Sequence, residues 1–298
     1  MFESNEFYGH ANLMRQWCGL PRRLPIGARL QHGWTPNGGL LDAHLAEPWP
    51  ALIWSQRNLD YCNTLGVTNV VPVGAPFLYL PETPDPGPSQ PRSLLVFPFH
   101  GWEKEQVAGD FSSYADAIAE LEADGYGPVT VCLYWLEYED PALRAIFERR
   151  GWRVVTAGQR DGNPTFLVGQ RELLREHAFV TANRVCTAAF YALSEGRPFF
   201  LHGPSMGLDG THDPDGLVFD AWQREALPTL TLDAFDGECQ QALGAYELGA
   251  EFRRTPEELR TLLNWNASQA PIRWLTRVRR FFWSMRLWSG RMSARSKA

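Results

Sequence analysis

Several features that would assign a protein class directly are missing from this sequence. It contains no run of eighteen apolar residues, and its polar start, MFESNE, has no signal-peptide pattern, so we expect neither a membrane-spanning helix nor export from the cytoplasm. Its five cysteines are odd in number and widely spaced, which favours buried free thiols over disulfides or a zinc site. The motifs HExxH, CxxC and GxSxG and the lysine-containing phosphate loop are absent, and no metal site is predicted.

Acidic residues are also absent from the end of the chain. All 34 acidic residues lie at or before Glu258, whereas nine of the 28 basic residues follow it. From 271 to 292, large apolar side chains recur at steps of three and four residues beside a face of arginines, which predicts an amphipathic helix. We expect this tail to bind an anionic membrane surface. The alternative is a helix packed on the acidic body of the protein, whose charge argues against binding nucleic acid.

The rest of the 298-residue chain, long enough for one or two domains, alternates apolar runs with helical patterns. Before a proline-rich segment at 81–93, strands are predicted at 28–31, 51–54 and 69–73, with helices at 6–18 and 59–65. After it, strands are predicted at 94–98, 129–133, 153–156, 178–180 and 197–201, with helices at 113–124, 141–150 and 171–176. This alternation predicts an α/β protein of two parallel-sheet units, joined by a linker and separated by a cleft that the carboxyl ends of the strands line.

Polar residues follow one of these strands at the predicted start of a helix. Thr181, Asn183 and Arg184 come directly after the apolar run that begins at Ala178, and Thr187 lies one helical turn further on. The start of a helix carries free N–H groups and partial positive charge, and an arginine adds a bidentate fork, so a phosphate group is the natural ligand. The alternative is that Thr181 and Asn183 only cap the helix.

Histidines follow three of the predicted strands. His32 occurs in QHGWTP after the first strand, His100 in FPFHG after the first strand of the second unit, and His202 in LHGP after the last strand. An imidazole titrates near neutrality and is the usual base for removing a proton from a hydroxyl. A single histidine at a strand end is more often structural, but three of them predict a shared cleft.

The order of the motifs is similar to that of a known enzyme family. The motifs that carry the similarity are, in order, QHGWTP, IWSQRN, VPVGAPFLY, LLVFPFHG, VVTAGQRDGNPTFL and VTANRVCTAAFYALSEGRPFFLHGP. Over residues 8–205 they resemble bacterial GT-B-fold glycosyltransferases of surface-polysaccharide (capsule, O-antigen, lipopolysaccharide) biosynthesis. They are more distantly similar to the glycerophosphotransferases of teichoic acid assembly. The resemblance implies two Rossmann-like units facing each other across a cleft: an acceptor-side domain at 1–85, a nucleotide-donor-binding domain at 94–245, and a helical basic and aromatic tail at 246–298.

Carried over by position, the resemblance also implies roles for individual residues. His32 would be the general base, whereas His100 and His202 are placed at the cleft only by their positions after strands. The residues implied to hold the donor phosphate are Thr181, Asn183, Arg184 and Thr187. Those implied to lie near the nucleoside are Gly158, Arg160 and Glu195, with Glu195 on the ribose hydroxyls.

The implied reaction is the transfer of a sugar from a nucleotide-activated donor to a hydroxyl of a lipid-linked glycan, with inversion and without a metal ion, at the inner face of the cytoplasmic membrane. The nucleotide sugar is a substrate, so no cofactor is implied. Three other interpretations remain open at this point. They are a glycerophosphotransferase that uses a CDP-linked donor, a nucleotide-sugar epimerase, and a non-catalytic scaffold of glycan assembly.

Overall fold

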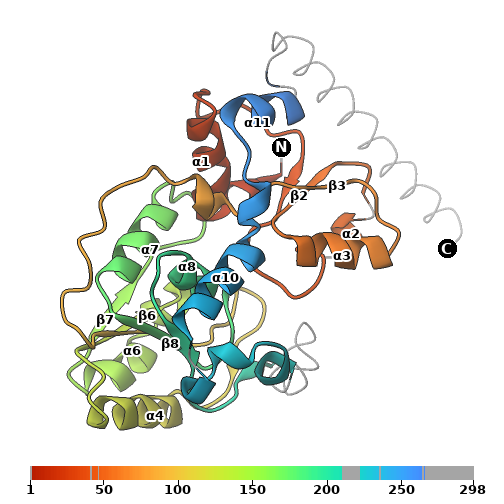
Figure 1. Cartoon of the computed structure of the whole chain (residues 1–298). Coiled ribbons are helices and arrows are strands. Elements are labelled where there is room, and N and C mark those ends of the chain that lie inside the picture. The colour runs from red at the N-terminus through yellow and green to blue at the C-terminus, as the bar shows by residue number, and fades with distance from the viewer. Residues whose placement is uncertain are drawn as a thin grey trace, which may run out of the picture.

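The computed structural model describes residues 2–40, 42–45, 47–209, 222–234, 236–263 and 265. Figure 1 shows a small sheet that includes β2 and β3 and a larger sheet that includes β6, β7 and β8. Helix α10 leads from the larger unit toward the smaller one, and α11 lies beside α1. The chain therefore passes from the first unit to the second and returns to the first.

The first unit is built on a three-stranded parallel sheet in the order β1–β2–β3. Its strands are β1 (Arg29–Leu30), β2 (Ala51–Ile53) and β3 (Val70–Pro72), which confirm the three strands expected before the proline-rich segment. Its helices and 3₁₀ turns are η1 (Glu3–Gly9), α1 (His10–Trp17), α2 (Asp42–Leu45), α3 (Gln56–Thr64) and η2 (Pro76–Tyr79). The single helix predicted over 6–18 is broken between η1 and α1, where Tyr8 and Gly9 have φ angles of 56° and 74°. A side chain at position 9 would lie 2.8 Å from the carbonyl oxygen of Pro164, so this close approach requires glycine.

The second unit is built on a five-stranded parallel sheet in the order β7–β6–β4–β8–β9. Its strands are β4 (Leu94–Phe97), β6 (Val129–Leu133), β7 (Arg153–Thr156), β8 (Phe179–Ala182) and β9 (Phe199–Leu201), and all five confirm strands expected from the sequence. Its helices are α4 (Phe111–Ala123), α5 (Trp135–Glu139), α6 (Pro141–Glu148), α7 (Phe166–Arg175) and α8 (Thr187–Ser194). An antiparallel pair, β5 (Val107–Ala108) and β10 (Gly207–Leu208), was not expected, because two-residue strands leave no periodic pattern. The predicted α/β class with two parallel-sheet units is confirmed.

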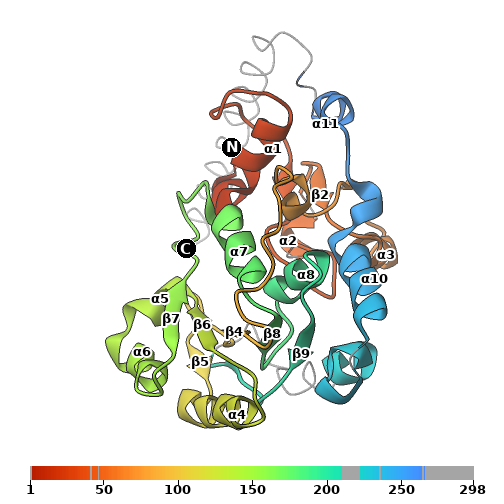
Figure 2. The same cartoon turned by 60° about the vertical axis from the view of Figure 1, so that its left-hand side comes forward.

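Side chains alternate between the two faces of the larger sheet. On β4, Leu94 and Val96 join the core under α4 and α6, whereas Leu95 and Phe97 join the core under α7 and α8. Figure 2 shows these two pairs of helices on opposite sides of the sheet. The core under α7 and α8 also contains residues of the first unit, so the two units are not packed independently.

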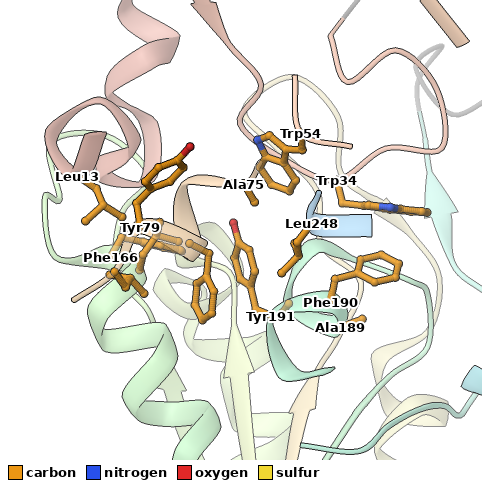
Figure 3. Packing of buried hydrophobic residues seen from close by; sticks show 14 of the residues in the cluster. Leu13, Trp34, Trp54, Ala75, Tyr79, Phe166, Ala189, Phe190, Tyr191 and Leu248 are labelled. Carbon is orange, nitrogen blue, oxygen red and sulfur yellow. The ribbon is translucent and has the colours of Figure 1, made fainter. Parts of the chain in front are cut away.

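Aromatic side chains join the two units over this shared core. The ring of Phe77 in η2 stacks on Tyr191 of α8, with centroids 4.1 Å apart, and the ring of Trp54 lies 6.3 Å from the same tyrosine. Figure 3 shows the Tyr191 side chain pointing toward Trp54 and Ala75 of the first unit. Rigid-body opening of the two units would expose these rings to water, which is unfavourable.

The proline-rich segment at 81–93, predicted to be a linker, is held against the second unit. Arg171 of α7 donates a hydrogen bond to the carbonyl of Pro81 at 2.7 Å, and Arg197 forms an ion pair with Asp85 at 2.7 Å. Ser89 donates its main-chain N–H to the carbonyl of Glu176 at 3.0 Å. The segment is therefore bound to the second unit on the side of α7 and is not a flexible linker (Figure 1).

After the second unit the chain returns to the first. The elements of this part are η3 (Pro228–Leu230), η4 (Leu232–Ala234), α10 (Gly237–Leu248), η5 (Ala250–Phe252) and α11 (Pro256–Leu262). The Trp17 indole donates to the carbonyl of Arg254, and the N–H of Arg254 donates to the Tyr79 hydroxyl, both at 3.0 Å. The predicted boundary at 245/246 thus falls within α10, and the amphipathic helix predicted over 271–292 lies outside the described residues. Within the residues that are described, no helix is long and apolar enough to cross a membrane.

Gly249 locks the end of α10 onto the first unit. Its φ is 67°, and a Cβ at this position would overlap the carbonyl oxygen of Trp54.

We expect Gly249→Ala to lower the free energy of unfolding by about 2 kcal/mol or more, since alanine adds a steric clash and is strained at this positive φ. Urea denaturation measures the change. The matched control is Gly169→Ala in α7, where an added Cβ meets no atom within 4 Å, and it should stabilise the protein by up to about 1 kcal/mol. Equal effects of the two substitutions would contradict a special requirement for glycine at position 249.

Candidate active site

A cavity of about 310 Å³ lies where the two units meet. Its walls include the loops after β1, β4, β6 and β7, the start of α8, and the break between η1 and α1. The residues singled out from the sequence that line it are His32, His100, Gly158, Arg184 and Thr187. Parallel α/β sheets bind ligands at the carboxyl ends of their strands because loops and helix starts converge there, and this cavity has that position.

The start of α8 forms part of one wall. Cys186 is the residue before the helix, so Thr187 is its first residue, and both line the cavity together with Arg184. The N–H groups at the start of a helix carry partial positive charge, and in α8 the N–H of Ala189 donates to the carbonyl of Cys186 at 3.0 Å. The Arg184 guanidinium lies 4.7 Å from the centre of the Phe99 ring and adds a full positive charge to the same wall. This wall suits an anionic ligand.

Thr181 and Asn183, predicted to contact phosphate, belong to the sheet framework instead. Strand β8 continues through Ala182, so the helix starts later than the sequence pattern indicates. The Thr181 hydroxyl donates to the carbonyl of Phe200 at 2.8 Å. The Asn183 side chain accepts the N–H of Phe99 at 2.9 Å and donates to the carbonyl of Pro204 at 3.1 Å. Both residues are buried and neither lines the cavity, so they position the loops rather than a ligand.

His32 lies in the part of the cavity wall that belongs to the first unit. The Gln31 side chain fixes its loop by accepting the N–H of Trp54 at 2.8 Å and donating to the carbonyl of Gly33 at 2.9 Å. Burial, followed by the positive charge of Arg160, lowers the pKa of His32 to about 4. The imidazole is therefore neutral at pH 7 and can accept a proton.

His10 is a second histidine of this wall, and no sequence motif marked it. It is the first residue of α1, it lines the cavity, and its side chain is completely buried (0% exposed). Burial and then the nearby His32 lower its pKa to about 3. Its position within an ordinary helical pattern offers no signal, because its burial depends on the contact between the two units.

Aromatic residues form the wall on the β6 side of the cavity. His100, which is exposed, stacks on Tyr134 after β6 with ring centroids 4.2 Å apart and an interplanar angle of 18°. Tyr8 also lines the cavity and packs on Phe166 with centroids 4.8 Å apart. Tyr8 and Tyr134 were not identified from the sequence, since isolated tyrosines carry no motif.

Gly158 and Arg160 follow β7, as expected for residues near the cleft, but their positions differ. Gly158 lines the cavity with φ of 93°, and a Cβ there would lie 2.8 Å from the Asn163 amide nitrogen. Arg160 forms an ion pair with Glu103 at 2.6 Å and lies 4.1 Å from the centre of the Phe7 ring. Arg160 therefore closes the contact between the units and acts on the cavity through its charge.

Glu195 and His202 lie away from the cavity. Glu195 follows the last residue of α8 and pairs with Arg175 at 2.5 Å, whereas the cavity lies at the first residue of that helix. Eight residues of helix separate the two ends by about 12 Å, so Glu195 does not reach a nucleoside bound in this cavity. One ring nitrogen of His202 lies 3.0 Å from the carbonyl of Ala117 in α4, on the other side of the sheet.

The described part of the chain contains no group of three or more His, Cys, Asp or Glu side chains arranged to hold a metal ion. Arg184 and the start of α8 line the cavity, and Arg160 acts on His32 from outside it.

No protein-family model matches the chain, and no curated protein matches it. Several solved structures are similar to it in part, among them the following three. A mutant of S. aureus TarM in complex with fondaparinux, alpha-GlcNAc-glycerol and UDP has 13% identity and a TM-score of 0.35, over 72% of this chain and 43% of that one. S. aureus MnaA with UDP has 11% identity and a TM-score of 0.41, over 89% of this chain and 81% of that one.

The third is the UDP-GlcNAc 2-epimerase of Neisseria meningitidis bound to UDP-GlcNAc, with 11% identity and a TM-score of 0.35, over 70% of this chain and 57% of that one. The chain thus spans less than half the length of the TarM structure. At these identities and TM-scores, the similarities assign no family and no activity to it.

The buried His10 should make stability depend on pH in a defined window. Its pKa is about 3 in the folded protein and about 6.5 in an unfolded chain, so between these values only the unfolded state binds the proton. Stability should fall as the pH drops below 6.5, and His10 should contribute about 1.4 kcal/mol per pH unit between pH 6 and pH 4. Urea denaturation of the wild type and of His10→Gln at pH 7, 6, 5 and 4 measures the slope. An identical slope in the variant would contradict the buried, neutral state of His10.

Proposed function

We propose that the protein is a GT-B-type glycosyltransferase that moves a sugar from a nucleotide-activated donor to a hydroxyl of a surface-glycan acceptor. One observation carries the proposal: His32 from the first unit and Arg184 and Thr187 from the second line the same cavity. Glycosyl transfer needs a counter-charge for a departing phosphate and a base for the incoming hydroxyl. The two walls offer one of these groups each.

The wall formed by α8 is proposed to hold the donor phosphates. When the bond between sugar and phosphate breaks, negative charge collects on the phosphate oxygens. Arg184 and the N–H groups of the first turn of α8 stabilise that charge without having to reorganise, since the shared core holds them in place. In this mechanism they supply the positive charge that a metal ion supplies in other transferases.

His32 is proposed to remove the proton from the acceptor hydroxyl. In the proposed reaction the acceptor oxygen attacks the anomeric carbon from the side opposite the phosphate, which gives inversion. The pKa of His32 in the empty site, about 4, makes it a weak base. A bound diphosphate places negative charge near the imidazole and raises its pKa, so the base becomes stronger when the donor is present.

The acceptor is proposed to be a lipid-linked glycan of capsule, O-antigen or lipopolysaccharide assembly. This part of the proposal rests on the aromatic and arginine-rich pattern at 271–292, which lies outside the described residues. Such a segment would hold the enzyme at the inner face of the cytoplasmic membrane, where a lipid-linked acceptor is presented.

A nucleotide panel tests the donor site. We expect one of CMP, CDP, UDP, GDP and dTDP to raise the melting temperature of the wild type, since a ligand at about 100 times its Kd adds about 2.7 kcal/mol of stability. Arg184→Ala should lose this shift. The control is Arg150→Ala, which removes another paired arginine, one bound to Asp116 far from the cavity, and should keep the shift. The absence of a shift with every nucleotide would contradict the proposal.

The role of His32 is tested by His32→Gln. We expect it to keep nucleotide binding and to reduce sugar transfer by about 10² to 10⁴, the usual contribution of a general base. The measurement is nucleotide release from the corresponding nucleotide sugar in the presence of a lipid extract. His202→Gln is the control, because His202 lies outside the cavity, and it should retain full activity.

The same assay should show a characteristic pH dependence. Since His32 must be unprotonated to act as a base, kcat/KM of the wild type should fall in acid near pH 4 rather than near pH 6.5. Unchanged transfer by His32→Gln would exclude His32 as the base.

A further inference from the structure

A buried ion pair lies behind the wall formed by the first unit. Glu247 of α10 is completely buried (0% exposed), and Arg57 of α3 donates to both of its carboxylate oxygens at 2.6 to 3.0 Å. The same carboxylate accepts the indole N–H of Trp34 at 2.8 Å. A buried carboxylate is stable only when its oxygens are paired, so Glu247 holds both partners firmly.

Trp34 connects this ion pair to the start of α8. Its side chain packs on Phe190 with ring centroids 4.8 Å apart, and its main-chain N–H donates to the Thr187 hydroxyl oxygen at 2.9 Å. Trp34 follows His32 by two residues, and both line the cavity. One tryptophan therefore joins α10, α8 and the loop that carries the proposed base.

The contact determines what the Thr187 hydroxyl can do. A hydroxyl group has one proton to donate, and its oxygen can accept hydrogen bonds. Here the oxygen accepts the N–H of Trp34, and no hydrogen bond donated by this hydroxyl to another described residue is found. Because Thr187 lines the cavity, its proton remains available to a ligand oxygen.

We propose that Glu247 is a positioning residue of the phosphate site: it holds Trp34, and Trp34 orients the Thr187 hydroxyl so that its proton faces an anionic ligand. The inference rests on the proposed function. Glu247 does not line the cavity and is fully buried, so it acts through Trp34 and not on the substrate. The sequence pattern assigned residue 247 to the C-terminal tail, where no link to a ligand was expected.

A double-mutant cycle tests the inference. Glu247→Gln replaces one acceptor oxygen by an NH₂ group, so either Trp34 or Arg57 loses an acceptor. The full-length protein is titrated with whichever of CMP, CDP, UDP, GDP and dTDP gives the largest shift in the panel. We expect Glu247→Gln to weaken binding about tenfold in the wild type, and by less than about twofold when Thr187 is already Val. A tenfold loss in both backgrounds would overturn the inference, because a general loss of stability acts regardless of Thr187.

Two further variants separate positioning from damage to the fold. Trp34→Phe keeps the Glu247–Arg57 pair and replaces the indole by a smaller ring without an N–H, so it should reproduce the loss of affinity even if Glu247→Gln does not fold. Glu195→Gln removes the carboxylate of another arginine pair, with Arg175 at the opposite end of α8, and should leave the affinity unchanged. Unchanged affinity in Trp34→Phe, or an equal loss in Glu195→Gln, would overturn the inference.

If none of the five nucleotides of the panel binds the wild type, the proposed function fails and the link to Thr187 is tested by unfolding. Trp34→Phe and Thr187→Val are then combined in urea denaturation. Non-additivity of about threefold or more in the unfolding equilibrium constant supports the link from Trp34 to Thr187. Additive effects overturn it.

Discussion

The packing of α8 between the two sheets is the constraint on which the rest of the molecule depends. One side of this helix covers the larger sheet, while Tyr191 meets Phe77 and Trp54 of the first unit. This contact brings the start of α8 beside the loop after β1, so that both walls of the cavity are present in one fixed arrangement. Burial of apolar surface contributes about 25 cal/mol for each Å² removed from water, so separating the two units would be costly. The cavity is therefore built into the fold.

Electrostatics divides the cavity into two ends. The α8 side carries Arg184 and the partial charge of a helix start, whereas the opposite wall carries His10 and His32 in their neutral forms. Burial keeps both imidazoles neutral, and Arg160 acts in the same direction on His32. An anionic ligand at α8 would reverse the effect of that arginine, which couples ligand binding to the basicity of His32.

The return of the chain to the first unit completes this arrangement. Within three residues, Glu247 binds Arg57 and Trp34, Leu248 accepts the N–H of Ala75 at 2.8 Å, and Gly249 approaches Trp54. These contacts link α10 to the first unit at the level of the cavity. The region assigned to a tail on the basis of charge thus begins with residues that hold the two units together.

The sequence by itself determined the strands of the two parallel sheets. Apolar runs bounded by Gly and Pro are local signals, so all eight of these strands followed from them. Only the tertiary structure decided where α8 begins. The end of β8 is set by hydrogen bonds to neighbouring strands, which no residue type in the sequence marks, so Thr181 lies in the sheet while Thr187 begins the helix and Glu195 follows its end. It also decided the burial of His10 and the partners of Glu247, since these depend on packing between residues far apart in the chain.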